Sequence, residues 1–217
     1  DVVVQRDGRV VHAVTLTGDG ERAHLRHAAI SLDDHIADVV GLVDAEELTD
    51  IVLVGHSYGG MVITGAADQL TARGPGRVRQ LVYVDAMVPV PGEGWGSGHP
   101  PEIAQARLAA AREHDNALPP PDPGAFGLDD ADREWLRRRH VPHPFGMYRV
   151  PLQFDAPRWA ALPRCFIDCN QPAYPTIDAM RERVRQQPGW RIEVLPTGHF
   201  PMVSMPQRMV QLLLSLA

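Results

Sequence analysis

A serine between glycines is the side chain of this sequence with the clearest capacity for chemistry. Residues 55–60 read Gly-His-Ser-Tyr-Gly-Gly and match the pattern Gly-x-Ser-x-Gly. That pattern places its serine on a tight turn from a strand into a helix, so that the hydroxyl projects above the edge of a sheet. The flanking glycines let neighbouring backbone approach without a Cβ clash. Because so short a pattern also occurs by chance, a nucleophilic Ser57 requires a strand before it and a helix after it.

The neighbouring residues predict that arrangement. Residues 50–54 (Asp-Ile-Val-Leu-Val) are typical of a buried strand, and residues 61–72 have helical character that ends at the Gly-Pro-Gly of residues 74–76. The N-terminus of this helix would direct free N–H groups and the positive end of its dipole at a developing oxyanion. Ser57 is therefore the predicted nucleophile.

A serine hydroxyl is a poor nucleophile unless a base takes its proton. Among ten histidines, His199 is singled out by its position in the loop between a predicted strand at 191–195 and a predicted helix at 204–216. Where a serine is activated on such a turn, the histidine comes last in the chain. His140 and His143 lie in an irregular segment and could line a pocket. Structural roles are expected for five further histidines, namely His12, His24, His27, His35 and His114.

The third member of such a site is a buried carboxylate that fixes the tautomer of the histidine and stabilises its charged form. Asp85 directly follows a predicted strand at 79–84, and Asp168 ends another at 164–168. The strand before Asp85 follows the helix after Ser57, so these two strands should be neighbours. A buried charge at that strand end needs a partner, which His199 would provide. Asp85 is the preferred acid, and Asp168 remains the alternative.

These residues require a sheet that brings strand ends together. Continuous apolar strands that alternate with helices predict an α/β fold with a mostly parallel sheet and helices on both faces. Further elements are expected as a buried strand at 10–16, a helix at 33–47 with Ser31 as its N-cap, and a helix at 176–187.

The alternation stops in residues 89–157, where proline and glycine are frequent. This segment carries two helix candidates, at about 101–114 and 129–140, and is predicted to be an insertion that forms a helical cap. Its aromatic residues would either shape a substrate pocket or only pack the cap. They are Trp95, Phe126, Trp135, Phe145 and Tyr148.

Composition bounds the remaining possibilities. A length of 217 residues fits a single domain over 1–217, and a formal net charge of −6 disfavours a nucleic-acid partner. No apolar run approaches the ~20 residues of a membrane span, and no signal peptide is visible, so a cytoplasmic protein is expected. Cys165 and Cys169 are too few for a disulfide framework and are expected to be reduced. No metal and no cofactor is predicted, and the oligomeric state is left open.

Several segments together resemble a bacterial α/β-hydrolase family that is related to plant salicylate-ester esterases and hydroxynitrile lyases. The resemblance covers most of the chain and is weakest in the insertion. It implies an α/β-hydrolase fold, Ser57 as nucleophile, His199 as base and the backbone N–H of Tyr58 as an oxyanion donor. The segments that carry it are AVTLTG, GERAHL, HIADVV, VLVGHSYGGMV, LVYVDAMVP and TGHFPMV.

The chain departs from this family in two places. The plant relatives have an apolar residue at the position of Asp85 and their acid in the later loop, whereas this loop offers Asn170, Gln171 and prolines. Haloalkane dehalogenases are similar in placing an acid at the end of this strand, but Ser57 excludes their aspartate nucleophile.

The family also implies an earlier strand and an His-Gly loop with a second oxyanion donor. Residues 1–8 are expected to be the end of the helix after that loop, so the strand and the loop are expected to be absent.

The residues therefore predict a serine hydrolase of a small ester, lactone or related acyl compound, working through an acyl-enzyme. One alternative is a lyase or another non-hydrolytic enzyme that uses the same three residues, because this fold hosts many chemistries. A second alternative is a ligand-binding protein that keeps the fold and turns over poorly. In each case the partner is a small molecule.

Overall fold

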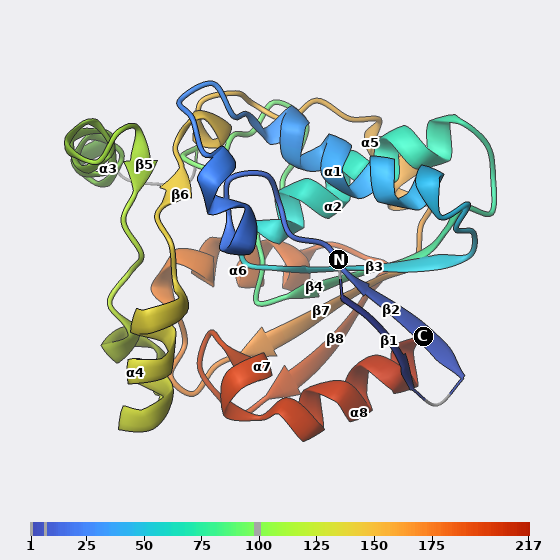
Figure 1. Cartoon of the computed structure of the whole chain (residues 1–217). Coiled ribbons are helices and arrows are strands. Elements are labelled where there is room, and N and C mark those ends of the chain that lie inside the picture. The colour runs from blue at the N-terminus through green and yellow to red at the C-terminus, as the bar shows by residue number, and fades with distance from the viewer. Residues whose placement is uncertain (1, 7, 98–100) are drawn as a thin grey trace.

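Four parallel strands form the central sheet of the computed structural model (Figure 1). The structure describes residues 2–6, 8–97 and 101–217. Outside the described residues lie 1, 7 and 98–100. The predicted single domain (1–217), the predicted helix end (1–8) and the predicted insertion (89–157) each include some of them. The strands of the sheet, in spatial order, are β3 (Ile51–His56), β4 (Val78–Val84), β7 (Arg164–Cys169) and β8 (Trp190–Leu195).

The strand pairing decides which loops meet. β3 pairs with β4, β4 with β7 and β7 with β8, each in parallel. The predicted adjacency of the strands before Ser57 and Asp85 is thus confirmed, because His56 lies opposite Val84. Parallel strands end at one edge of a sheet, so the segments that follow β3, β4, β7 and β8 gather at this edge.

Helices cover both faces of the sheet, as the apolar pattern predicts. Figure 1 shows α1 (Leu32–Ala45) and α2 (Gly59–Ala72) on one face and α8 (Pro206–Leu216) on the other. Side chains of α1, α2 and α6 (Asp178–Gln186) share one core with Leu81 and Tyr83 of β4. The intervening residues of the same strand, Val82 and Val84, join α8 in the opposite core, as the two-residue period of a strand requires.

The predicted elements of the sheet match the structure to within a few residues. Ser31 caps α1 as expected, because its side chain accepts the backbone N–H of Asp34 while the Asp34 carboxylate accepts the backbone N–H of Ser31. This reciprocal pair satisfies two donors at the start of the helix. The shorter helical segments are η1 (Gly20–Leu25), η4 (Pro175–Ile177) and α7 (Pro201–Ser204).

The first residues differ from the prediction. β1 (Val2–Arg6) and β2 (Arg9–Ala13) form an antiparallel hairpin outside the central sheet. The expectation of a helix end in residues 1–8 is therefore wrong for residues 2–6, which form a strand. The strand expected at 10–16 is shorter than predicted and not buried, since Val10 and Val11 are 52% and 51% exposed. β-Branched residues indicated a strand here, but they do not reveal what covers its faces.

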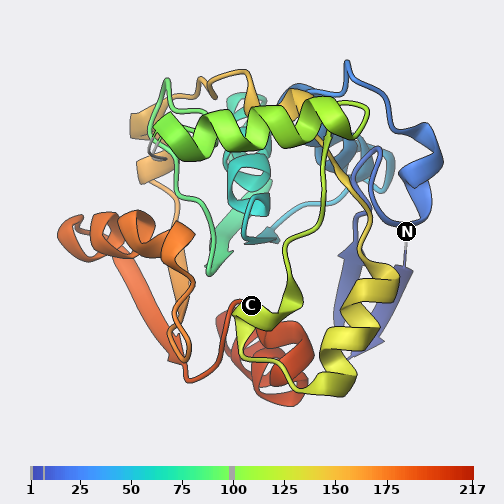
Figure 2. The same cartoon turned by 90° about the vertical axis from the view of Figure 1, so that its left-hand side faces the viewer.

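The segment between β4 and β7 crosses the end of the sheet. It contains the two predicted helices as α3 (Pro101–Glu113) and α4 (Asp130–Arg139), which Figure 2 shows on the near side of the molecule, α3 across the top and α4 at the lower right. β5 and β6 pair with each other in antiparallel fashion between them. The remaining elements of the segment are β5 (Ala117–Leu118), η2 (Pro123–Phe126), β6 (His143–Pro144), η3 (Gly146–Tyr148) and α5 (Ala156–Ala160).

The turn between β3 and α2 is closed by a backbone contact that only glycine allows. A Cβ atom at Gly60 would lie 1.9 Å from the carbonyl oxygen of Met87, whereas a Cβ at Gly59 would meet nothing within 4 Å. The Met87 backbone N–H in turn donates to the carbonyl of Ser57 at 2.9 Å. Gly60 thus lets the segment after β4 pack directly on the turn that carries Ser57.

We predict that Gly60→Ala destabilises the protein by about 1–3 kcal/mol, the usual range for overpacking. Gly59→Ala is the matched control, because its methyl group enters open space and a compatible Gly→Ala change stabilises by ~0.4–1 kcal/mol. Urea unfolding of both variants measures the difference. Equal free energies of unfolding for the two variants would show that the contact with Met87 does not constrain the turn.

Candidate active site

Ser57 lies on a strained turn between β3 and α2. Its φ of +53° is in the left-handed region, which non-glycine residues enter at a cost of ~1–3 kcal/mol. Two backbone hydrogen bonds hold this conformation: the Ser57 N–H donates to Val84 at 3.2 Å, and the Ser57 carbonyl accepts from Met87 at 2.9 Å. The strain is therefore balanced by the fold, as expected for a serine displayed on such a turn.

His199 connects Ser57 to Asp85. It follows β8, and its Nε2 lies 3.0 Å from the Ser57 Oγ while its Nδ1 lies 2.7 Å from Oδ2 of Asp85. Asp85 has no exposed surface and His199 is 3% exposed. With Asp85 ionised, the Nδ1–H donates to the carboxylate, which leaves Nε2 to accept the hydroxyl proton of Ser57. The structure thus brings together the three residues that the sequence singled out.

Asp168 does not reach this histidine. Its Oδ1 accepts from Arg181 and its Oδ2 from Arg185, each at 2.7 Å. Asp85, with a φ of +42°, leaves the end of β4 and turns toward His199, and its N–H still donates to Ile167 of β7 at 2.8 Å. Of the two candidate carboxylates, only Asp85 is hydrogen-bonded to His199.

Burial sets the protonation of the pair. It raises the pKa of Asp85 to about 6, even though the charge of Arg181 and its hydrogen bond to Asp85 act in the opposite direction. It lowers the pKa of His199, which Arg181 lowers further. At neutral pH Asp85 is therefore ionised and His199 uncharged, the combination in which the imidazole can accept a proton.

His56 also supports this arrangement, although the sequence did not single it out. Its Nε2–H donates to the backbone carbonyl of His199 at 2.6 Å, and the two rings lie 4.6 Å apart. Burial lowers the pKa of His56 to about 3, so the side chain is uncharged. It fixes the loop of His199 without adding charge. Its place beside Ser57 in the motif was the available signal.

Tyr58 directly follows Ser57, and its side chain is buried in the core. It is the N-cap of α2, where the first N–H groups of a helix have no partner within the helix. Its hydroxyl donates to Nδ1 of His35 at 3.1 Å, because the His35 Nε2–H donates to the carbonyl of Thr17 at 2.9 Å. His35 thus has a structural partner, as expected from the sequence.

The insertion packs against the loop of His199. A Cβ atom at Gly198 would lie 1.9 Å from the carbonyl oxygen of Phe126, so η2 contacts this loop directly. The rings of Tyr174, Phe126 and Phe200 lie 4.5, 5.6 and 5.4 Å from that of His199. These aromatic side chains shield the imidazole from water. Trp135, by contrast, is 41% exposed and does not join them.

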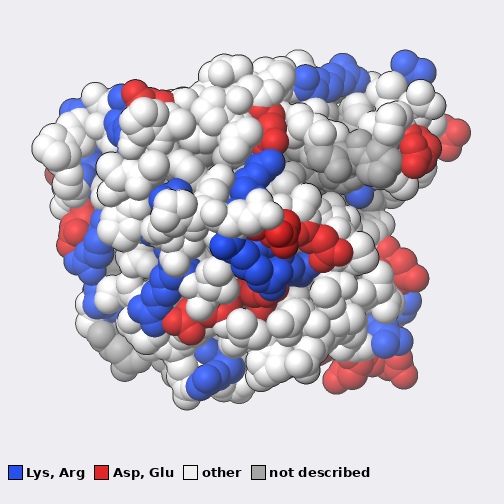
Figure 3. Space-filling view, turned by 180° about the vertical axis from the view of Figure 1, so that it is seen from behind, with Lys and Arg blue, Asp and Glu red and all other residues white. Residues whose placement is uncertain are grey.

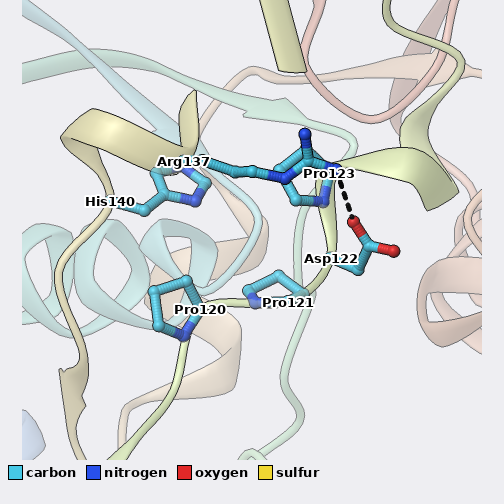
Figure 4. Close-up of a pocket in the computed structure, with 6 residues that line it drawn as sticks. All are labelled: Pro120, Pro121, Asp122, Pro123, Arg137 and His140. Atoms are coloured by element: carbon cyan, nitrogen blue, oxygen red, sulfur yellow. Dashed lines mark hydrogen bonds and ion pairs between the residues drawn. The ribbon is translucent and has the colours of Figure 1, made fainter. Parts of the chain in front are cut away.

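A separate pocket of about 250 Å³ lies between α4 and the proline-rich residues before η2 (Figure 4). His140 lines it, and its ring contacts Phe200 at 5.6 Å. Arg137 reaches Asp122 across the pocket at 3.5 Å. His143 lies elsewhere and pairs with Asp19 at 2.8 Å. The pocket has none of the residues around Ser57 and is lined by Pro120, Pro121, Asp122, Pro123, Arg137 and His140.

Other kinds of site find little support in the described part of the chain. It contains no group of three His, Cys, Asp or Glu side chains that could hold a metal ion. Cys165 and Cys169 are free and buried, and burial raises the pKa of Cys165 to about 12, so that thiol is protonated. Among the described helices, none combines the length and apolarity that crossing a membrane requires. On the face in Figure 3, arginine and acidic side chains lie beside one another without forming a single basic area.

Comparison with known proteins identifies the family. The model of the Alpha/beta hydrolase family matches residues 3–212. This chain belongs to that family. The α/β-hydrolase is 35% identical to a carbendazim hydrolyzing esterase of Nocardioides sp. (strain SG-4G), over 98% of its own length and 90% of the relative. It is 24% identical to Methylesterase 7 of Arabidopsis thaliana, over 97% and 86% of the two chains. These relatives support an enzyme of the carboxylesterase type.

Solved structures show the same fold. An extracellular α/β-hydrolase from a Paenibacillus species, described as homologous to Tobacco Salicylic Acid Binding Protein 2, matches with a TM-score of 0.73 and 18% identity. The match covers 88% of this chain and 81% of that one. Tomato Methylketone Synthase I matches with a TM-score of 0.68 and 16% identity, over 93% and 84%. At such identities the likeness concerns the fold alone.

We predict that the His199–Asp85 pair takes up its first proton as the pH falls through about 6, the raised pKa of Asp85. Above this pH the Nδ1–H of His199 donates to a carboxylate, and below it to an uncharged acid. Nitrogen NMR of labelled His199 should follow this step, which belongs to the coupled pair. Asp85→Asn should abolish it. A midpoint near the ordinary carboxyl value of 3.8 would contradict the burial argument.

Proposed function

We propose that this α/β-hydrolase cleaves small esters, lactones or related acyl compounds through a covalent intermediate on Ser57. The observation that carries the proposal is the unbroken chain of hydrogen bonds from the Ser57 hydroxyl through His199 to Asp85, at 3.0 and 2.7 Å. An ionised, buried carboxylate and an uncharged imidazole are the resting state that general-base activation of a serine requires. The esterase relatives support the same reaction class.

The geometry supports the following sequence of steps. The Ser57 Oγ attacks the carbonyl carbon of the substrate while its proton passes to Nε2 of His199. The resulting imidazolium is stabilised by Asp85, and the backbone N–H of Tyr58 donates to the oxyanion. The Nε2–H then protonates the leaving alkoxide, which departs and leaves an acyl-serine. Water, deprotonated by the same nitrogen, hydrolyses this ester and restores Ser57.

The proposal includes the domain organisation. Residues 1–217 form one domain, and the insertion of residues 89–157 acts as its cap. The insertion follows the strand that ends at Asp85, and through Phe126 it contacts the loop of His199. A segment fixed in this way limits the space above Ser57. Its side chains therefore determine which acyl and alcohol groups fit, and small molecules are the expected substrates.

We predict that Ser57→Ala lowers kcat/KM for nitrophenyl esters by a factor on the order of 10³ or more and leaves the free energy of unfolding nearly unchanged. Ser57 is partly exposed and the change removes a single hydroxyl group, so we expect the chemistry to be lost and the fold to be kept. Steady-state rates over a series of acyl lengths, with circular dichroism as control, give the measurement. A folded Ser57→Ala variant that retains more than about a tenth of the activity would refute the proposal. Cleavage of a cyanohydrin without ester hydrolysis would favour a lyase instead.

A further inference from the structure

We propose that Arg181 is a positioning residue of this site, which keeps Asp85 ionised and oriented toward His199. The inference rests on the proposed role of Asp85 in catalysis. It adds a fourth residue to the site formed by Ser57, His199 and Asp85. Arg181 contacts neither Ser57 nor the space where a substrate reacts. It acts through the carboxylate that it holds.

The Arg181 side chain lies between two carboxylates. One of its terminal nitrogens donates to Oδ1 of Asp85 at 2.5 Å, and its Nε donates to Oδ1 of Asp168 at 2.7 Å. The other terminal nitrogen donates to Asp178 at 2.7 Å and to the carbonyl of Tyr174 at 2.9 Å. Only 4% of the side chain is exposed. Since the guanidinium is rigid and its donors are engaged in several directions, its orientation is fixed.

This contact determines how Asp85 is held. Its Oδ1 accepts from Arg181, and its Oδ2 accepts from His199 at 2.7 Å. With both oxygens engaged, the carboxylate cannot rotate away from the imidazole. The hydrogen bond from Arg181 therefore sets the direction in which Asp85 presents its second oxygen.

Arg181 also balances charge. Asp85 is completely buried and Asp168 is 1% exposed, and they occupy matching positions at the ends of β4 and β7. Two buried carboxylates side by side favour protonation of one of them unless a cation lies between them. The titratable groups around Asp85 are His56 at the end of β3, Asp168 and Cys169 on β7, Arg181 on α6, and His199 after β8.

Within this set, Arg181 is the cation in direct contact with Asp85. His56 and His199 are uncharged at neutral pH, because burial lowers the pKa of each. Arg185 pairs with Asp168 and is half exposed. Protonation of Asp85 would remove the negative charge that stabilises the imidazolium. Loss of Arg181 should therefore raise the pH below which the enzyme is inactive.

Arg181 could instead only attach α6 to the sheet, and a double variant separates the two roles. Arg181→Met removes the cation that Asp85 and Asp168 share, which leaves Asp168 with Arg185 only and should destabilise the fold. Arg181→Met combined with Asp168→Asn removes one positive and one negative charge, which restores the balance of the cluster. A merely structural role predicts that recovered stability restores activity. A positioning role predicts that Asp85 still lacks its donor and that catalysis remains impaired.

The experiment measures urea unfolding and the pH dependence of kcat/KM for a nitrophenyl ester. We expect the double variant to fold and to lose tenfold or more in kcat/KM. The acidic limb of its pH profile, which is the pH at which kcat/KM falls as the solution is acidified, should rise by ~1–3 units, because a neighbouring opposite charge usually lowers a carboxyl pKa by that much. Arg181→Lys keeps the charge and should hold the limb within about one unit of the parent. Arg183→Met is the matched control on α6, since Arg183 pairs with Glu93 at 2.7 Å and should keep the parent limb.

A double variant with the parent kcat/KM and acidic limb would overturn the inference, and so would an Arg181→Lys variant whose acidic limb moves as far as that of the double variant. So would a limb shift of equal size in Arg183→Met. Failure of the proposed function has a different signature, because Ser57→Ala would then remain active in the parent background. An inactive Ser57→Ala variant together with an unaltered double variant would refute the role of Arg181 alone.

Discussion

The ionised carboxylate of Asp85 is completely buried, and this buried charge constrains the rest of the site. A buried carboxylate is strongly unfavourable unless charged or hydrogen-bonding partners replace its hydration. Here the partners come from distant parts of the sequence, namely Arg181 on α6 and His199 after β8. The charge therefore selects structures in which α6, β4 and the last loop lie together, and it ties the stability of this region to its chemistry.

The parallel sheet makes that convergence possible. Ser57 and Asp85 follow neighbouring strands, and both adopt a left-handed backbone that turns the chain sharply at the sheet edge. These two turns support each other, because the segment after Asp85 donates a hydrogen bond to the carbonyl of Ser57 through Met87. Strain at one turn is thus balanced by contacts to the other. The insertion completes the edge by packing η2 against the loop of His199.

The sequence predicted those parts of the molecule that depend on local patterns. The alternation of apolar strands and helices gave the parallel sheet, and the motif around Ser57 gave its turn. His199 and Asp85 were selected by topology, because both follow strands that end at the same edge. The pattern did not reveal the hairpin at the start of the chain. β-Branched residues mark a strand, but its burial depends on which segments cover it.

The arginines of α6 could not be ranked from the sequence. Arg181, Arg183 and Arg185 alternate with other residues in one short helix, and all three form ion pairs. They differ in their partners. Arg181 contacts the two buried carboxylates of Asp85 and Asp168, Arg183 pairs with Glu93, and Arg185 pairs with Asp168. Which carboxylate each one meets depends on the angle at which α6 crosses the sheet, and that angle is set by tertiary packing. His56 escaped notice for a similar reason, since its partner is a backbone carbonyl 143 residues away.

We propose that Asp85, through His199, makes Ser57 nucleophilic. The most direct measurement is the rate at which a serine-directed organophosphonate labels Ser57, followed by mass spectrometry of the labelled peptide, in Asp85→Asn and Asp168→Asn variants. Asn at position 85 keeps the shape but favours the wrong imidazole tautomer, an effect on the order of 10⁴ in a well-studied triad. Asn at position 168 keeps an acceptor for Arg181. We expect labelling to be slowed by about 10³–10⁴ in Asp85→Asn and by less than about tenfold in Asp168→Asn. The reverse order, with both variants folded, would contradict it.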